Sequence, residues 1–541
     1  MEGQPLADNF VRGRWARGSS GPFFGRSVSV VHDLTSDEQW YLYRKTAEIK
    51  AAVLEGRDLT AYRYGDKDLS VYLIFLEDST RTKESFRNAA LFHQATVSVF
   101  DAAHSSFNKK ESLTDTLKML VGYSRRSIFI LRSTVEGVTR ALEVTIGDYC
   151  RKAGIEPPSF LNAGDGKHEH PSQEFLDEFS FLEKKGWNRD HLHIALTGDL
   201  YFGRTVHSKA DGLKVFRHVT VDLVAPSELG LPEFYRQKME ANGFTVRTFP
   251  SIDAYLGQAD VADVWYFTRL QLERMGEDVL DKVERLKHAV TVRPDHLDKL
   301  PEGTKFYHPL PQNRTEPTIP DFVTPLPLNG WDEQSRNGYF TRITLIGMVA
   351  GCLGLDFEGE LKKEVESADD FVEEGRINPH GKAVEYKMGI KPVDDGIVID
   401  HIGMGRSVEQ IWKLLDKIRR NLQLNYLASM GVFSSVKSDV VKGLISIPVL
   451  PDLGFKKVKK LAALSPGCTL NIVHGKRVIR KYRLHMPPKI YNFAEIGCRN
   501  ENCISHAKQH EGIGPEFERR GDGFVCRFCE RPHTYDDIWT D

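Results

Sequence analysis

One stretch decides the expected fold and points to the candidate site: Val71-Tyr-Leu-Ile-Phe-Leu-Glu-Asp-Ser-Thr-Arg-Thr-Lys83. It begins with a continuous apolar run at residues 71–76, which is the pattern of a strand covered on both faces. Asp78 and Ser79 then supply favourable N-cap side chains, and apolar residues recur beyond them at helical spacing. The stretch therefore predicts a buried strand that runs directly into a helix.

The start of this helix suits an anion. Unpaired backbone N–H groups and the positive end of the helix dipole favour a phosphate there. Ser79, Thr80 and Thr82 add hydroxyl donors, and Arg81 adds a guanidinium group whose geometry matches phosphate oxygens. Taken alone, the segment fits an ordinary capped helix with a solvated arginine equally well.

The composition is that of a long and nearly neutral chain. Its 541 residues suffice for several domains, and its net charge of −2 gives no electrostatic reason to expect nucleic acid or an anionic membrane. The longest apolar run, 343–355, is too short and too rich in glycine to span a bilayer. The first residues lack the pattern of a secretory signal, so we expect a soluble, cytoplasmic protein.

Strands and helices are predicted to alternate from residue 27 to residue 355. Helices stand out at 36–54 and 336–355, and residues 160–173 are expected to form a glycine-containing loop. Further strands are predicted at 97–100, 127–131, 193–197, 219–224, 261–267 and 305–307. This alternation indicates the α/β class, with two doubly wound parallel-sheet domains.

Polar residues follow several of these strands, at the edge where parallel sheets place their ligands. Arg132 ends one strand, and Thr268-Arg-Leu-Gln271 and His308-Pro-Leu-Pro311 follow two others, although many arginines at strand ends are merely exposed. His168 and His170 are a weak metal signal, because no third ligand stands nearby in the sequence. A neutral, hydrogen-bonding His170 is the favoured interpretation.

The character of the chain changes after residue 357. Residues 358–385 are charge-rich without clear periodicity, which is typical of a linker. A small α+β unit follows, with a helix near 408–418 and strands at 396–402, 444–449, 470–472 and 477–482.

Four cysteines near the C-terminus form two close pairs, Cys498-x4-Cys503 and Cys526-x2-Cys529. Four thiolates match a tetrahedral structural zinc site, which leaves no open position for catalysis. Disulfides are disfavoured because no secretory signal is evident. Small zinc ribbons bind nucleic acid, bind proteins or only hold a fold together, and the acidic residues around these cysteines argue against nucleic acid.

Six motifs, taken in chain order, resemble those of the aspartate carbamoyltransferase family. They are Ser79-Thr-Arg-Thr82, Asn162-Ala-Gly-Asp-Gly166, His170-Pro-Ser-Gln173, Gly203-Arg-Thr-Val-His207, Thr268-Arg-Leu-Gln271 and His308-Pro-Leu-Pro311. The part from Gly396 onward resembles the regulatory chain of that family, through Val398-Ile-Asp-His-Ile402 and the cysteine pairs. The resemblance implies a fusion of catalytic and regulatory chains that transfers a carbamoyl group from carbamoyl phosphate to L-aspartate in pyrimidine biosynthesis.

The resemblance also implies roles for the matching residues. The residues expected at the phosphate of carbamoyl phosphate are Ser79, Thr80, Arg81, Thr82 and Arg132. Thr82, Arg132 and His170 are expected at its carbonyl oxygen. Gln173 is expected at its nitrogen. Those expected at the acceptor are Arg204, Arg269 and Gln271, with the backbone carbonyls of Leu310 and Pro311 orienting the reacting groups. We expect no catalytic metal and no covalent intermediate, because fixed cations and N–H donors can stabilise an anionic tetrahedral state.

Two further residues match positions that a neighbouring subunit lends to the site, Ser105 and Lys109. Lys110 takes the place of Lys109 if the alignment of this loop slips by one residue. The resemblance therefore implies a homo-oligomer, either a trimer or a dimer of trimers. Glu77 and Arg274 match positions that stabilise the closed arrangement of the catalytic domains.

In the regulatory part, six residues align with positions that contact a nucleotide effector: Asp400, His401, Lys456, Lys460, Asn471 and Lys481. Lys456 and Lys460 are four residues apart, which places two cations on one helical face and suits a triphosphate. A solvated lysine face is the alternative, and Pro392 and Lys476 depart from the pocket of the family.

The expected domains are carbamoyl-phosphate-binding at 1–165 (completed by the helix at 335–357), aspartate-binding at 166–334, linker at 358–385, regulatory and nucleotide-binding-like at 386–487, and structural zinc at 488–541. Two other functions compete with this interpretation. An ornithine carbamoyltransferase typically carries cysteine where this chain has Ser172 and Pro309, and a cationic acceptor suits two arginines poorly. An inactive nucleotide-binding regulator would not need the intact set of motifs. Lys83 and Tyr201 depart from residues common in the family, which affects the expected affinity and not the reaction.

Overall fold

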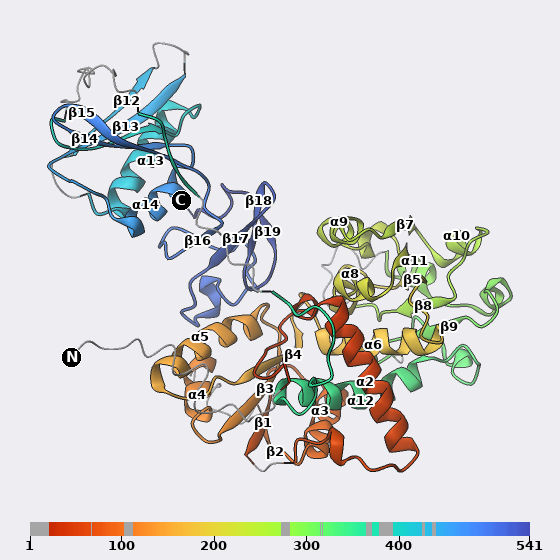
Figure 1. Ribbon diagram of the computed structural model, residues 1–541. Helices are drawn as coiled ribbons and strands as arrows, with labels where there is room; N and C mark the ends of the chain where they lie inside the picture. Colours follow the sequence, from red (N-terminus) through yellow and green to blue (C-terminus); the bar gives the residue numbers. More distant parts are fainter. Residues whose placement is uncertain are drawn as a thin grey trace. The chain divides into compact units, whose positions relative to one another are not determined.

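The computed structural model describes residues 21–540, except 66–67, 102–111, 272–281, 314, 316, 364–370, 378–392, 425–427 and 435–439. The chain divides into two compact units (Figure 1). The first comprises Met1–Lys363 with Asn500–Ile513 and Phe528–Glu530, and the second comprises the other segments from Glu364 onward. None of the described helices is long and apolar enough to cross a membrane.

A parallel sheet with the order β2-β1-β3-β4 forms the amino-terminal lobe of the first unit. Its strands are β1 (Leu69–Phe75), β2 (Thr96–Asp101), β3 (Arg126–Ser133) and β4 (Ser159–Asp165). The expectation of a loop at 160–173 is wrong for its first part, which forms β4. Every residue of β4 is buried, so its backbone groups need partners, and β3 supplies them.

A second parallel sheet, with the order β7-β6-β5-β8-β9, forms the other lobe. Its strands are β5 (His191–Thr197), β6 (His218–Val224), β7 (Thr245–Phe249), β8 (Val264–Phe267) and β9 (Lys305–Tyr307). We did not predict β7, a strand at the sheet edge whose residues are exposed or half-buried. The two lobes confirm the expected α/β class with parallel sheets.

Helices cover both sheets. Those that bear on the site are α2 (Ser36–Leu54), α3 (Thr80–Phe92), α4 (Leu113–Leu120), α5 (Val138–Ala153), α6 (Pro171–Lys184), α7 (Arg204–His207), α8 (Lys209–Gly212) and α12 (Trp331–Ala350). The last of them starts before the predicted range of 336–355 and stops at Gly351, whose φ of 85° ends the helix. Ser112 caps α4 by accepting a hydrogen bond from the Asp115 backbone N–H.

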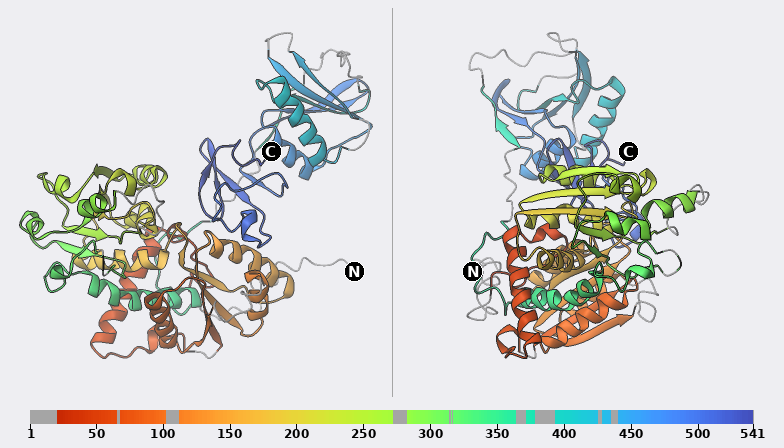
Figure 2. Two further views of the ribbon diagram at one scale, coloured as in Figure 1. Left: turned by 180° about the vertical axis from the view of Figure 1, so that it is seen from behind. Right: turned by 90° about the vertical axis from the view of Figure 1, so that its right-hand side faces the viewer.

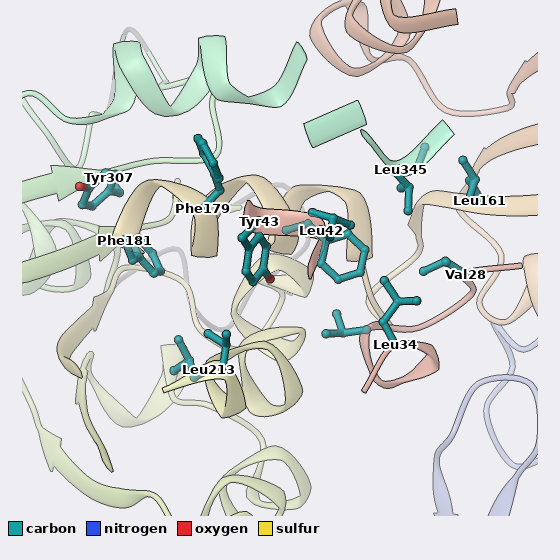
Figure 3. Close-up of a cluster of buried hydrophobic side chains, with 14 of the residues drawn as sticks. Val28, Leu34, Leu42, Tyr43, Leu161, Phe179, Phe181, Leu213, Tyr307 and Leu345 are labelled. Atoms are coloured by element: carbon teal, nitrogen blue, oxygen red, sulfur yellow. The ribbon is translucent and has the colours of Figure 1, made fainter. Parts of the chain in front are cut away.

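One apolar core continues beneath both lobes. α12 packs against α2, α3 and α6, although it follows nearly all of the catalytic lobes in the sequence. Figure 3 shows the buried side chains that join the lobes, among them Leu161 from β4, Leu42 from α2, Phe181 from α6, Tyr307 from β9 and Leu345 from α12. This shared core fixes the facing edges of the two sheets.

The second unit contains an antiparallel sheet with the order β10-β15-β14-β11-β13-β12. Its strands are β10 (Val372–Glu374), β11 (Gly396–Ile402), β12 (Ser429–Ser434), β13 (Val441–Pro448), β14 (Thr469–His474) and β15 (Arg477–Leu484). β10 lies within the range predicted as linker, where it pairs with β15. The helices α13 (Val408–Asn421) and α14 (Phe455–Leu464) accompany this sheet, and Figure 2 shows α13 lying along it.

A smaller antiparallel sheet belongs to the cysteine region, with the order β16-β17-β18-β19. Its strands are β16 (Lys489–Tyr491), β17 (Glu516–Arg520), β18 (Gly523–Cys526) and β19 (Pro532–His533). Cys526 ends β18, so the short sheet helps to place this cysteine.

Candidate active site

A cavity of about 690 Å³ opens in the first unit, where the carboxyl ends of β1, β3, β4 and β8 meet the start of α3. All of the described residues predicted to bind the two substrates line it: Ser79, Thr80, Arg81, Thr82, Arg132, His170, Gln173, Arg204, Arg269, Gln271, Leu310 and Pro311. Ser105, Lys109, Lys110 and Arg274 lie outside the described residues. Segments far apart in the sequence thus contribute to one cationic cavity.

The start of α3 forms the cavity wall that the opening stretch predicts. Ser79 is the N-cap residue, with φ −162° and ψ 94°. Within the described residues its hydroxyl makes no capping hydrogen bond, so it is not used by the helix itself. Thr82 is buried and Arg81 is exposed where it lines the cavity. The first N–H groups of the helix, three hydroxyls and a guanidinium therefore stand together, which is a suitable set for a phosphate.

Two arginines from different lobes meet at one carboxylate. Arg132 Nη2 lies 3.1 Å from Glu77 Oε2, and Arg204 Nη2 lies 2.8 Å from the same oxygen. Arg132 also donates to the Ala163 carbonyl at 3.1 Å. Gly164 has a φ of +111°, and a Cβ there would lie 3.1 Å from both Arg132 Nη1 and Arg204 Cζ. Glycine suits this position because residues with a side chain rarely adopt such a φ, and the two guanidinium groups leave little room for a Cβ.

His170 is buried beside these cations, as the residue before α6. Burial, and then the positive charges of Arg132, Arg204 and Arg342, hold its pKa well below the usual value. The ring is therefore neutral. A neutral imidazole carries one N–H donor, which can polarise a carbonyl oxygen without adding a charge.

The sequence analysis missed three residues of α12 that line the cavity: Gln334, Ser335 and Arg342. Arg342 is 4% exposed, donates to Ser85 Oγ at 2.7 Å and lies 4.9 Å from the ring of Phe86. Burial lowers its pKa to about 10, against the opposing charge of Asp177. One signal for Arg342 was available in the sequence. A largely apolar helix does not need an arginine for solubility, so an arginine inside the predicted helix indicates another role.

The four clustered cysteines come together as predicted. All four are buried, and the Sγ atoms of Cys498, Cys503, Cys526 and Cys529 lie within 4.8 Å of one another. Thiolates about 2.3 Å from a central ion would be separated by somewhat less than this, so the set fits one tetrahedral metal ion. His533 lies nearby, with Nε2 3.8 Å from Cys498 Sγ, but this nitrogen also accepts the Arg499 backbone N–H at 3.1 Å.

The predicted effector residues all belong to the second unit. Asp400 and His401 stand at the end of β11, where Lys442 Nζ lies 2.9 Å from Asp400 Oδ1. Lys442 was not among the predicted effector residues, and it forms an ion pair with Asp400. Asn471 on β14 is opposite Lys481 on β15.

The two lysines predicted to share a helical face do lie on one helix, α14. Lys456 is exposed, and Lys460 Nζ lies 5.4 Å from the ring of Phe493. Their spacing thus agrees with the prediction, whereas the bound nucleotide remains an expectation.

Comparisons with known proteins match the regions in order. Residues 26–183 match the carbamoyl-P binding domain of aspartate/ornithine carbamoyltransferases. Residues 388–485 match the allosteric domain of the aspartate carbamoyltransferase regulatory chain, and residues 488–539 match its metal binding domain. The chain is 51% identical over 527 residues to Protein PyrBI of Thermotoga maritima, covering 96% of this chain and 99% of that protein.

Solved structures resemble the catalytic part. One is aspartate transcarbamoylase from Trypanosoma cruzi in complex with N-(phosphonacetyl)-L-aspartic acid, with a TM-score of 0.51 and 27% identity over 61% of this chain and 98% of that chain. Another is the same enzyme in complex with carbamoyl phosphate and aspartate, with a TM-score of 0.51 and 26% identity over 61% and 98% of the two chains.

Proposed function

Since the chain belongs to the aspartate carbamoyltransferase family, with catalytic and regulatory chains fused, we propose that the cavity of its first unit is where carbamoyl phosphate reacts with L-aspartate. The enzyme transfers the carbamoyl group to the amine of L-aspartate and forms N-carbamoyl-L-aspartate and phosphate for pyrimidine biosynthesis. We assign the reaction to the cytoplasm.

The donor binds at the start of α3. Its phosphate accepts from the first N–H groups of the helix and from Ser79, Thr80 and Thr82, while Arg81 and Arg132 neutralise its charge. A phosphate held by groups of fixed geometry is also a better leaving group, because the charge that it gains is already compensated.

The carbamoyl carbon becomes electrophilic through hydrogen bonds to its oxygen. Thr82, Arg132 and neutral His170 line the cavity beside the phosphate site and supply donors. When the aspartate amine attacks, negative charge accumulates on that oxygen and these donors stabilise it. Gln173 binds the carbamoyl nitrogen, and the carbonyls of Leu310 and Pro311 orient the groups that react.

The acceptor is recognised as a dicarboxylate. Arg204 and Arg269 each line the cavity and bind one carboxylate of aspartate, with Gln271 assisting. Its amine then reaches the carbamoyl carbon in a fixed orientation, which converts a bimolecular reaction into one between positioned groups. Catalysis requires no metal in this proposal.

A complete site requires two subunits. Ser105 and Lys109, or Lys110 in place of Lys109, come from the neighbouring copy of a homotrimer, alone or as a dimer of trimers. Mixing Arg132→Ala and Lys109→Ala proteins tests this, because a mixed trimer contains a site that carries neither substitution. Activity should reappear after subunit exchange. No recovery in trimers that mass spectrometry shows to be mixed would exclude sharing through Lys109, and Lys110→Ala repeats the test for the alternative.

The remaining proposals concern the carboxyl-terminal part. The buried four-cysteine set holds a structural zinc ion, for which thiolates are suitable ligands. A nucleotide effector binds near Asp400, His401, Lys456, Lys460, Asn471 and Lys481, where the lysines on α14 face its phosphates.

The gathering of Arg81, Arg132, Arg204 and Arg269 in one cavity is the observation that carries the catalytic proposal. A colorimetric assay for carbamoyl aspartate, with ornithine as the control acceptor, tests it. Product from aspartate alone supports the proposal. Product from ornithine would favour the related transferase, and no product from either acceptor would favour an inactive regulator.

A further inference from the structure

Asp177 lies behind the cavity, one helical turn after Gln173 on α6, and it is fully buried. Its Oδ1 accepts hydrogen bonds from Gln173 Nε2 at 2.8 Å and from Gln334 Nε2 at 2.6 Å. Its Oδ2 accepts from Lys209 Nζ at 3.1 Å. Donors from α6, α12 and α8 thus converge on one carboxylate.

This carboxylate decides which way the amide of Gln173 faces. An amide group has a donor end and an acceptor end, and either can face a polar partner in an open site. An ionised carboxylate only accepts, so Gln173 must direct its NH₂ group at Asp177. The oxygen of Gln173 is then the atom left for the cavity that this residue lines. An oxygen can accept from the NH₂ group of a carbamoyl donor, whereas an NH₂ group would repel it.

Asp177 also orients the side-chain amide of Gln334, another residue that lines the cavity. This residue also directs its NH₂ group at Asp177, and its Oε1 accepts the His308 backbone N–H at 2.9 Å. His308 Nδ1 accepts the Leu310 backbone N–H at 2.8 Å. Burial, and then the charges of Arg81 and Arg269, lower the pKa of His308 to about 3, which keeps this nitrogen available as an acceptor.

We propose that Asp177 is a positioning residue for carbamoyl transfer: it sets the orientation of the Gln173 amide and, through Gln334 and His308, the conformation of the turn at 308–311. The inference rests on the proposed role of Gln173 at the carbamoyl nitrogen. Lys209 makes the arrangement possible, because its fully buried ammonium group pairs with Asp177 and Lys209 is not itself among the residues that line the cavity.

Asp177→Asn is the direct test, because asparagine keeps the shape but cannot accept from all three donors. Its own NH₂ group can turn the Gln173 amide around. We expect kcat to fall by about 10- to 100-fold, the loss associated with misplacing a reacting group. The KM for aspartate should change much less, since its arginines do not touch Asp177.

Glu174→Gln is the matched control. Glu174 Oε2 lies 2.9 Å from the same Lys209 ammonium, so the substitution alters the same buried cluster on the same helix. No hydrogen bond among the described residues joins its side chain to Gln173 or Gln334. A kcat near that of the wild type is expected for this variant. An equal loss in both variants would mean that the cluster only supports the fold, and would overturn the inference.

Gln173→Ala separates the inference from the proposed function. If this variant keeps the wild-type kcat, the assigned role of Gln173 is wrong and the inference falls with it. If Gln173→Ala is impaired while folded Asp177→Asn is not, only the inference is overturned. Asp177→Asn should cost less in the Gln173→Ala background than in the wild type, because the route through Gln173 is already lost and only the route through Gln334 remains. Fully additive losses would contradict the proposal.

Gln334→Met covers the case in which Asp177→Asn does not fold. It leaves Asp177 paired with Lys209 and Gln173 and removes the two hydrogen bonds through which Gln334 joins Asp177 to His308. We expect a folded protein with kcat reduced by about tenfold. A wild-type kcat in this variant would overturn the coupling to the turn at 308–311.

Discussion

Glu77 Oε2 lies 2.8 Å from Arg204 Nη2, so a carboxylate that follows β1 holds an arginine of the other lobe. Arg132 Nη2 is 3.1 Å from the same oxygen. One carboxylate therefore positions the arginine assigned to the phosphate and the arginine assigned to aspartate. Anionic substrates need the donors of both groups, so Glu77 both orients these arginines and competes for them.

Glu77→Gln tests which of these effects is larger. We expect kcat/KM for aspartate to fall on the order of tenfold, because a neutral amide orients two guanidinium groups less well than a carboxylate. Steady-state kinetics at saturating carbamoyl phosphate measures it. Glu143→Gln removes a carboxylate paired with Arg140 outside the cavity and serves as the control. A lower KM for aspartate in Glu77→Gln would instead show that competition dominates.

Arg81→Ala should reduce kcat by about 10²- to 10³-fold or more, as happens when one preorganised group is removed from a developing anion. The protein should remain folded, because Arg81 is exposed where it lines the cavity. Arg87→Ala is the comparison, since Arg87 is an exposed arginine of the same helix that pairs with Glu84. Turnover close to that of the wild type in Arg81→Ala would remove the basis for a phosphate site at α3.

Arg342→Met should make the folded protein more stable and, at the same time, weaken its binding of carbamoyl phosphate. Among the described residues no carboxylate lies within 4.0 Å of Arg342, so its buried charge lacks a direct partner. Burial of a charge without a nearby carboxylate costs desolvation energy, so an apolar side chain of similar length should be neutral or stabilising at this position. The cavity would lose one positive charge, and the KM for carbamoyl phosphate should rise.

Thermal unfolding and kinetics on the same sample check both expectations for Arg342. Arg126→Met provides the contrast, because Arg126 is also buried but lies 3.4 Å from Glu156 and donates to the Ala350 carbonyl. That variant should be destabilised. A lower unfolding temperature in Arg342→Met as well would show that Arg342 supports the fold more than the site.

His93 gives the stability of the protein a predictable dependence on acid. Burial lowers its pKa from 6.5 to about 4, so the unfolded chain takes up a proton below pH 6.5 that the folded chain does not. Stability contributed by the neutral ring is present above pH 6.5 and is lost as the pH falls toward 4, by roughly 1.4 kcal/mol per pH unit.

Urea unfolding of the wild type and of His93→Gln at pH 7 and pH 5 measures this effect. The substitution should reduce the difference between the two conditions. His168 acts in another range, because Asp165 outweighs burial and raises its pKa to about 10. An identical acid dependence in the two proteins would contradict a buried, neutral His93.

Metal analysis tests the cysteine cluster. The purified chain should contain about one zinc ion, and Cys503→Ser should lose most of it, because three thiolates bind less tightly than four. Cys468→Ser, which changes a buried cysteine outside the cluster, should keep the metal. Sizing and activity measurements after chelation show whether assembly depends on the ion. A full zinc content in Cys503→Ser would refute the assigned ligands.

The sequence predicted the local part of this architecture best. β1 and α3 follow from a continuous apolar run and an N-cap, and α2 has the bounds that its periodicity indicates. β4 was missed because two glycines obscured a short buried strand that β3 holds in place. β12 was missed as well, and it lies at an edge of its sheet, where few of its residues need to be apolar.

The site residues that belong to short sequence motifs could be predicted. The site residues that are placed only by contacts between distant segments could not. Arg81, Arg204 and Arg269 each belong to a short motif, and Arg132 ends a strand that the sequence predicts. The bond between Asp177 and Gln334 joins α6 to α12, and no local pattern indicates that these helices meet. Arg342 was missed for the same reason.

The late position of α12 in the chain has a consequence for biosynthesis. This helix packs against α2, α3 and α6, so the amino-terminal lobe cannot finish burying its apolar surface until Ala350 has left the ribosome. The nascent chain must hold the first lobe in an unfinished state while the second lobe is translated. Chaperones that shield exposed apolar segments would therefore bind the amino-terminal lobe, which is translated first but completed last.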